Sequence, residues 1–164
     1  MVRRKLLLCP AVAAVLLAGS ASVAPAIGSR SLPASEAGCT ADVTKALIRK
    51  FARNYSLGRV SVIDRLWAPE PRFYWFSSGP PGARLGPPAY VRATLASYFR
   101  SRVRRHERIR LTEVRARYDP RRKIVNFSGK LVRSADDLPP RPPTDFKGAA
   151  DCVSGRPALI VWSM

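Results

Sequence analysis

The chain has 164 residues, of which 29 are Lys or Arg and 11 are Asp or Glu, so its formal net charge is +18. This length corresponds to one domain with a core of its own. A single histidine, and cysteines that lack ligand spacing, argue against a zinc site. The positive charge attracts polyanions, but most basic residues are Arg and Pro is abundant, as GC-rich coding would also produce.

The first 26 residues have the pattern of a signal peptide. Residues 3–5 are basic, the apolar run over 6–17 is short for a membrane span, and Ala24-Pro25-Ala26 fits a small-residue cleavage site. We therefore expect cleavage after Ala26 and a secreted or extracytoplasmic mature chain of net charge +15, with no transmembrane span. An uncleaved N-terminal anchor is the alternative.

Two cysteines remain after that cleavage, Cys39 and Cys152. An exported chain meets oxidising conditions, in which an even pair of cysteines usually forms a disulfide. The sequence therefore predicts a Cys39–Cys152 bridge, and two separate thiols are the alternative. We expect no metal and no cofactor.

Three helices are predicted in the first two thirds of the chain. After a flexible leader over 27–38, the domain over 39–164 begins with a helix from about Thr40 to Tyr55. Its apolar residues recur at i+4 spacing, and they are Val43, Leu47, Phe51 and Tyr55. A short helix over 60–67 follows, and a third is predicted over 89–105. The inner side of the third helix is predicted to hold Val91, Leu95, Tyr98, Phe99 and Val103.

Strands make up most of the rest. The aromatic run over 73–76 is bounded by proline and glycine and predicts a strand before the third helix. Residues 109–118 alternate, with a phase slip that predicts a β-bulge near Thr112. Strands are also predicted over 125–131, 146–152 and 158–162. This order predicts an α+β fold in which N-terminal helices pack in a curved, bulged antiparallel sheet.

This order of elements resembles the nuclear transport factor 2-like superfamily, which includes the SnoaL-like and ketosteroid-isomerase-like proteins. The segment over 64–70 that leads into the aromatic strand, the helix over 89–105 and the bulged strands carry the resemblance, which covers residues 40–164. It implies a cone-shaped domain with a pocket at its wide end. Members use that pocket for isomerisation, dehydration, epoxide hydrolysis or ligand binding, and fold alone does not choose among these.

Catalytic groups are sparse in this sequence. In the isomerase-like pattern an aspartate base lies near the end of the first strand, where this chain has no carboxylate over 75–78. A dehydratase-like site needs a His–Asp pair, and His106 lies at a basic helix end. The best acid–base candidates are Asp151, in an apolar strand, and Tyr98. The alternative for Asp151 is that it faces solvent or pairs with an arginine.

Aromatic residues are the stronger signal for a site. Six of them lie on elements that the resemblance brings together as a pocket lining: Tyr55, Trp67, Trp75, Tyr98, Phe99 and Trp162. Such a lining suits a flat or apolar ligand. The alternative is that these side chains form the core.

We therefore predict an exported domain that binds a small apolar or aromatic ligand in the cone pocket without catalysis. The first alternative is a lyase, isomerase or hydrolase that acts on a small hydrophobic substrate. The second is a polyanion-binding surface protein, whose affinity would be diffuse and salt-sensitive because the arginines are scattered. The sequence leaves open whether the domain forms a homodimer.

Overall fold

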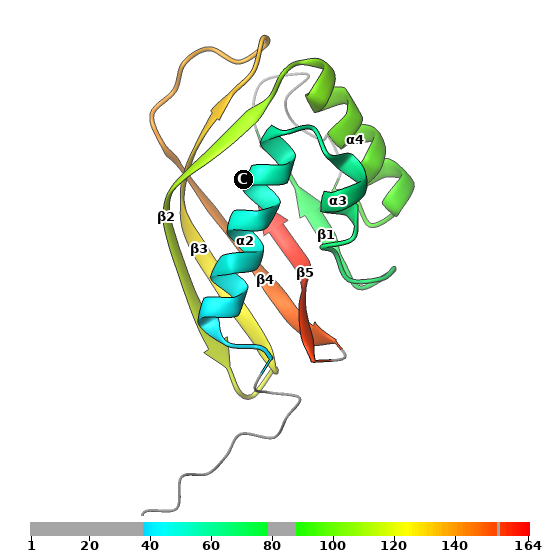
Figure 1. The fold of residues 1–164 in the computed structure, drawn as a ribbon, viewed down its shortest axis with the longest axis vertical. Helices are drawn as coiled ribbons and strands as arrows, with labels where there is room; N and C mark the ends of the chain where they lie inside the picture. The colour runs from blue at the N-terminus through cyan, green and yellow to red at the C-terminus, as the bar shows by residue number, and fades with distance from the viewer. Residues whose placement is uncertain (1–37, 79–87, 154) are drawn as a thin grey trace, which may run out of the picture. The chain divides into compact units, whose positions relative to one another are not determined.

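The first helix of the domain begins at a capping threonine. In the computed structural model, which describes residues 38–78, 88–153 and 155–164, α2 runs over Ala41–Ser56 (Figure 1). The side chain of Thr40 accepts a hydrogen bond of 3.2 Å from the backbone N–H of Val43, as expected for an N-cap. The predicted signal peptide, nearly all of the leader and residues 79–87 lie outside the described residues.

The buried face of α2 differs from the predicted stripe at its first turn. Leu47, Phe51 and Tyr55 are buried as predicted, but Val43 is 40% exposed. Residues four apart in a helix differ by roughly 40° around its axis. Val43 precedes Tyr55 by three such steps, so its side chain is rotated away from the sheet. Thr44 and Ile48 lie on the inner face instead, and both are 0% exposed.

Helices α3 and α4 both lie on the β1 side of α2 (Figure 1). Helix α3 is Val60–Asp64, and α4 is Arg92–Arg104. Helix α4 begins later than predicted because Ala89 pairs with Trp75 through two backbone hydrogen bonds of 3.0 and 3.1 Å, which keep the chain extended. Val91 is therefore the N-cap residue and is 50% exposed, so its predicted inner position is wrong.

Five strands form one curved sheet in the order β1-β5-β4-β3-β2. Neighbours are antiparallel except β1, which is parallel to β5 and makes the sheet mixed. The predicted bulge near Thr112 is confirmed by a register shift between Leu111 and Glu113. The bounds are Tyr74–Phe76 for β1, Arg108–Asp119 for β2, Ile124–Ser134 for β3, Thr144–Val153 for β4 and Arg156–Ser163 for β5.

The helices cover one face of the sheet, here called the inner face (Figure 1). The predicted disulfide joins Cys39, directly before the N-cap of α2, to Cys152 in β4, with Cα atoms 5.8 Å apart. No helix in the described part of the chain is long and apolar enough to span a membrane. The outer face of the sheet has no helix on it among the described elements.

Close packing across the inner face requires glycine in β4. A Cβ atom at Gly148 would lie 2.1 Å from the carbonyl oxygen of Val161 and 2.4 Å from the ring of Phe127. Gly148→Ala is therefore expected to destabilise the domain by about 1–3 kcal/mol through overpacking. Urea denaturation measures this as a lower midpoint at an unchanged m-value. The exposed Ser128→Ala is the control, and equal midpoints for the two variants would contradict the expectation.

Candidate functional site

The six aromatic residues predicted to line a pocket do come together on the inner face. They are Tyr55, Trp67, Trp75, Tyr98, Phe99 and Trp162, and none is more than 6% exposed. Their rings pack against one another and around Phe51, with centroids 4.6 Å apart for Phe51 and Trp162 and 5.0 Å apart for Trp75 and Phe99. The protein's own rings therefore fill the interior between helices and sheet, as the core alternative describes.

Tyr55 and Tyr98 carry hydroxyl groups into this interior. Burial raises the pKa of both phenols, with the negative charge of Glu107 as a smaller cause. The Tyr98 hydroxyl donates a 2.8 Å hydrogen bond to the Ser77 hydroxyl. Among the described residues, the Tyr55 hydroxyl has no hydrogen-bond partner. Both phenols remain protonated at neutral pH.

A buried ionic cluster lies next to these tyrosines. It consists of Arg102, Glu107, Arg133 and Asp137, and we call it the arginine cluster. Glu107 accepts hydrogen bonds from Nε of Arg102 and, at 2.8 Å, from Nε of Arg133. Arg102 donates two more, of 2.8 and 2.7 Å, to Asp137. The cluster ties the end of α4 to β3 and to the segment after it.

The pKa shifts in the arginine cluster follow from these hydrogen bonds. Burial alone would lower the pKa of Arg102, but its hydrogen bonds to Asp137 and Glu107 raise that pKa above its usual range. The hydrogen bonds from Arg102 lower the pKa of Asp137. Since both carboxylates are held by guanidinium groups, the cluster is suited to structural locking rather than proton transfer.

The two acid–base candidates are not brought together. Tyr98 points into the interior, where its ring lies 5.9 Å from that of Trp75. Asp151 follows Ala150, which is in the core, so strand alternation places Asp151 on the outer face. There it forms an ion pair with Arg72. The two groups lie on opposite faces of the sheet, so they cannot act on one substrate atom.

His106 lies at the surface, where α4 turns toward β2. Its Nδ1 is 2.8 Å from a carboxylate oxygen of Asp136, and the two side chains are 78% and 55% exposed. The hollow that His106 lines has a volume of about 150 Å³, which is below the usual range for small-molecule sites. Among the described residues, no group of three His, Cys, Asp or Glu side chains could hold a metal ion.

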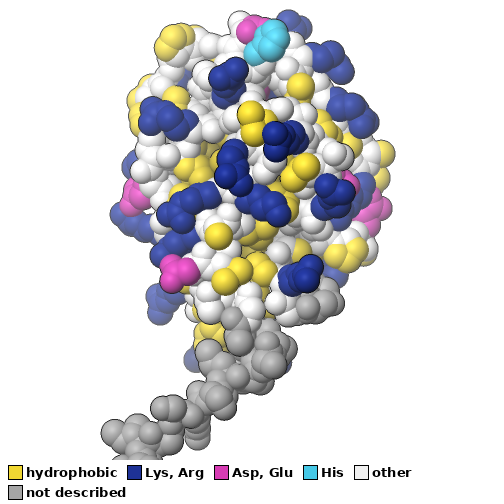
Figure 2. Space-filling model, in the orientation of Figure 1, with side chains coloured by type: hydrophobic (Ala, Val, Ile, Leu, Met, Phe, Trp, Pro, Cys, Tyr) yellow, Lys and Arg dark blue, Asp and Glu magenta, His cyan; other side chains and the backbone are white. Residues whose placement is uncertain are grey.

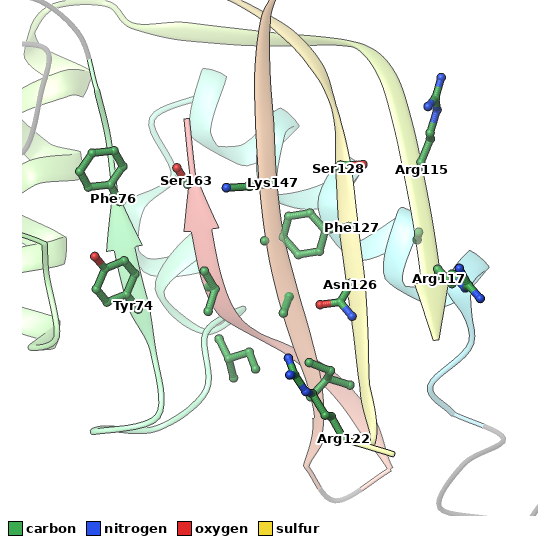
Figure 3. A pocket seen from close by; sticks show the side chains of 16 residues that line it. Tyr74, Phe76, Arg115, Arg117, Arg122, Asn126, Phe127, Ser128, Lys147 and Ser163 are labelled. Atoms are coloured by element: carbon green, nitrogen blue, oxygen red, sulfur yellow. The ribbon is translucent and has the colours of Figure 1, made fainter. Parts of the chain in front are cut away.

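A hollow of about 790 Å³ lies on the outer face of the sheet, and we call it the sheet groove (Figure 3). None of its 16 lining residues is Asp, Glu, His or Cys. Its volume is within the usual range for small-molecule sites. All five strands contribute side chains to it, including Tyr74 of β1, Val161 of β5 and Arg117 of β2.

The strand register arranges these side chains in rows across the sheet. One row runs Arg117, Asn126, Ala149, Val161, Tyr74, and the next runs Arg115, Ser128, Lys147, Ser163, Phe76. Each row therefore begins with an arginine on β2 and ends with an aromatic ring on β1. Figure 3 shows these arginines and rings at opposite sides of the groove. The sheet groove is thus cationic at one end and apolar at the other.

The cations of the sheet groove are only partly neutralised. A guanidinium nitrogen of Arg115 lies 2.5 Å from a carboxylate oxygen of Glu113. In the β2–β3 turn, Nε of Arg122 lies 4.0 Å from a carboxylate oxygen of Asp119. In the part of the chain that the structure describes, Arg117 and Lys147 have no acidic partner. A negatively charged group in the groove would therefore find cations available for pairing.

Basic side chains elsewhere are dispersed. Figure 2 shows Lys and Arg spread over the face that carries α2, with few acidic side chains between them. They form no single compact patch in this view. Diffuse, salt-sensitive polyanion binding stays a prediction.

Comparisons with known proteins give the fold. No protein-family model and no curated protein matches the sequence. A cystatin-like protein of unknown function from Nostoc punctiforme has a TM-score of 0.57 and 13% identity, over 73% of this chain and 85% of that one. An uncharacterised cystatin-like protein from Caulobacter vibrioides has a TM-score of 0.59 and 13% identity, over 74% and 85%.

A third solved structure supplies the name of the fold. It is a nuclear transport factor 2-like protein with a cystatin-like fold from Novosphingobium aromaticivorans, with a TM-score of 0.57 and 10% identity, over 74% of this chain and 78% of that one. At this identity the likeness is one of fold alone. The chain therefore has the α+β cystatin-like fold of the nuclear transport factor 2-like proteins, as the resemblance in its sequence implied.

Proposed function

We propose that this protein is an extracytoplasmic binding domain that holds, without transforming it, a small molecule with a negatively charged group and an apolar body. The sheet groove is the proposed site, in place of the interior pocket expected from the sequence. The observation that carries the proposal is the row from Arg117 through Ala149 and Val161 to Tyr74. The disulfide is compatible with an extracytoplasmic location.

The composition of the sheet groove favours binding over catalysis. Acid–base chemistry needs a proton-transfer group within hydrogen-bond reach of the reacting atom. The groove lining contains no carboxylate and no imidazole. The acids beside the groove form ion pairs with basic side chains: Glu113 with Arg115, Asp119 with Arg122 and Asp145 with Lys130. What remains is a surface that can desolvate an apolar body and pair with an anion.

A charge-matched pair of variants tests this proposal. The probe is 8-anilinonaphthalene-1-sulfonate, an aromatic anion whose fluorescence rises in an apolar site. Arg117→Ala/Lys147→Ala removes the two cations without acidic partners, and each charge-assisted hydrogen bond is worth about 1.5–3 kcal/mol. We therefore expect the dissociation constant of the dye, measured by fluorescence titration, to rise by at least about tenfold.

The control removes the same charge from another surface. Arg100→Ala/Arg104→Ala changes two exposed arginines of α4 and leaves the net charge equal to that of the first double variant. We expect this control to bind the dye as the wild type does. If both double variants lost affinity for the dye equally, the attraction would be diffuse and electrostatic. If neither lost affinity, the dye would bind elsewhere. Either result would contradict the proposal.

A further inference from the structure

The shape of the sheet groove narrows the class of ligand. From β2 to β1 the groove crosses every strand of the sheet. Four interstrand spacings of about 4.8 Å give a span of about 19 Å. A compact ring system would occupy one part of this length only. An extended molecule with its charge at one end would use the whole row.

The middle of the groove has an aliphatic floor. Ala149 of β4 and Val161 of β5 are register partners there, and both side chains are short. Beside them the register passes from Ala149–Val161 directly to Ala150–Leu159, so Ile160 is the extra residue of a β-bulge. Ile160 also lines the groove. The floor thus offers apolar contact along this row, whereas the row beside it carries Lys147 and Ser163. The ring of Phe127 also borders the groove, but it packs against Trp162 in the core.

The apolar end continues past the edge of the sheet. The ring of Tyr74 lies 5.2 Å from the ring of Tyr90 in an edge-on arrangement. Tyr90 is 54% exposed, which is unusual for so large an apolar side chain. Together with Phe76, these rings form an apolar surface at which the far end of an extended ligand would lie.

The cationic end matches an anionic head group. Arg117 and Arg122 both line the groove near the β2–β3 turn, and Arg117 has no acidic partner among the described residues. A guanidinium group binds a carboxylate through two parallel hydrogen bonds. A second copy of the chain would instead bring further cations to a surface that has no acid in its lining.

We infer that the ligand of the sheet groove is a single-chain acyl anion that lies across the strands, with its carboxylate at Arg117 and Arg122 and its tail at Tyr74 and Tyr90. This inference rests on the proposed function and adds the class and orientation of the ligand. It follows that affinity increases with chain length until the tail reaches β1. Each added methylene in contact with the floor is expected to raise affinity by about two- to fourfold.

The test is isothermal titration with octanoate, dodecanoate and palmitate below their micellar concentrations, and with hexadecanol as an uncharged match for palmitate. We expect the order palmitate, dodecanoate, octanoate, and at least about tenfold weaker binding of hexadecanol. Arg117→Ala should weaken all three carboxylates. Tyr74→Ala and Tyr90→Ala should weaken palmitate and leave octanoate unchanged, because octanoate is too short to reach β1. Tyr90 is exposed, so its variant keeps the test valid if Tyr74→Ala fails to fold.

The outcomes separate this inference from the proposed function. If the dye needs Arg117 and Lys147 but carboxylate affinity does not rise with chain length, the acyl inference is wrong and the binding proposal stands. The same holds if Tyr74→Ala weakens octanoate as much as palmitate. If neither dye nor carboxylate binds, and light scattering shows a dimer that Val161→Arg dissociates, a second copy covers the groove and both proposals fail.

Discussion

Replacing Cys39 and Cys152 together by serine is expected to lower the free energy of unfolding by about 4–5 kcal/mol. The disulfide closes a loop of 113 residues, which includes nearly all of the folded domain. In the chain-entropy model a cross-link of this span removes much of the conformational freedom of the unfolded chain. It also holds the start of α2 against β4, at the end of the domain opposite the arginine cluster.

Equilibrium denaturation in urea measures this effect on the oxidised protein, the protein reduced with dithiothreitol and the double serine variant. The reduced protein and the variant should unfold at similar midpoints, both well below that of the oxidised protein. Dithiothreitol should not change the variant, which controls for other effects of the reductant. A reduced protein that unfolds at the oxidised midpoint would show that the bridge contributes little.

Local patterns in the sequence predicted the elements well. The i+4 row of Leu47, Phe51 and Tyr55 describes the inner face of α2 because helix periodicity is local. The phase slip near Thr112 indicated a bulge because an extra residue reverses the alternation of all that follow. The errors at Val43 and Val91 lie at the starts of α2 and α4, where the surrounding chain decides which side chains are covered.

The sheet groove could not be predicted in the same way. Alternation shows that Arg115 and Arg117 share a face of one strand, and Tyr74 and Phe76 a face of another. Which residues lie opposite them depends on the cross-strand register and on strand order, which arise from packing and turns far away in the sequence. Only the register places Ala149 and Val161 between the arginine and aromatic ends.

The filled interior shows a second limit of prediction from the sequence. The six aromatic residues that the sequence analysis named are all buried, yet whether such residues enclose a space depends on how well their shapes fit. Interiors are packed nearly as densely as organic crystals, so a ring such as Phe51, in contact with Trp75, Phe99 and Trp162, is enough to fill a pocket. Such complementarity is a property of the three-dimensional arrangement and has no signature in spacing.

Glu107 shows a burial that the local sequence did not indicate. The basic stretch predicted an exposed setting for His106, which is 78% exposed, but the side chain of the next residue is 0% exposed. His106 adopts a positive φ of 52°, which ends α4 and turns the chain toward β2. Glu107 then faces inward, between Arg102 and Arg133. The arginine cluster is therefore the internal support of this end of the domain.

Removing that carboxylate tests the support directly. Glu107→Ala is expected to lower the free energy of unfolding by about 3–5 kcal/mol, because two buried guanidinium groups lose their shared counter-charge. Arg102 keeps its ion pair with Asp137, while Arg133 keeps its hydrogen bonds to the Ser78 carbonyl and the Tyr98 hydroxyl, which are uncharged. The side chains of Arg102 and Arg133 are only 1% and 10% exposed, so water cannot replace the carboxylate.

Two further variants separate the effect of the lost charge on stability from the effect of the lost side-chain packing. Asp136→Ala removes a carboxylate of the same surface region that is 55% exposed and forms an ion pair with His106, so its effect should be within about 1 kcal/mol. Glu107→Leu/Arg133→Leu replaces the buried pair by apolar groups and should recover part of the loss, since an uncompensated charge is costlier than an absent pair. Urea denaturation of the three variants gives the comparison. If Glu107→Ala unfolds at the midpoint of Asp136→Ala, the cluster does not support the fold, and its arginines are instead hydrated when Glu107 is removed.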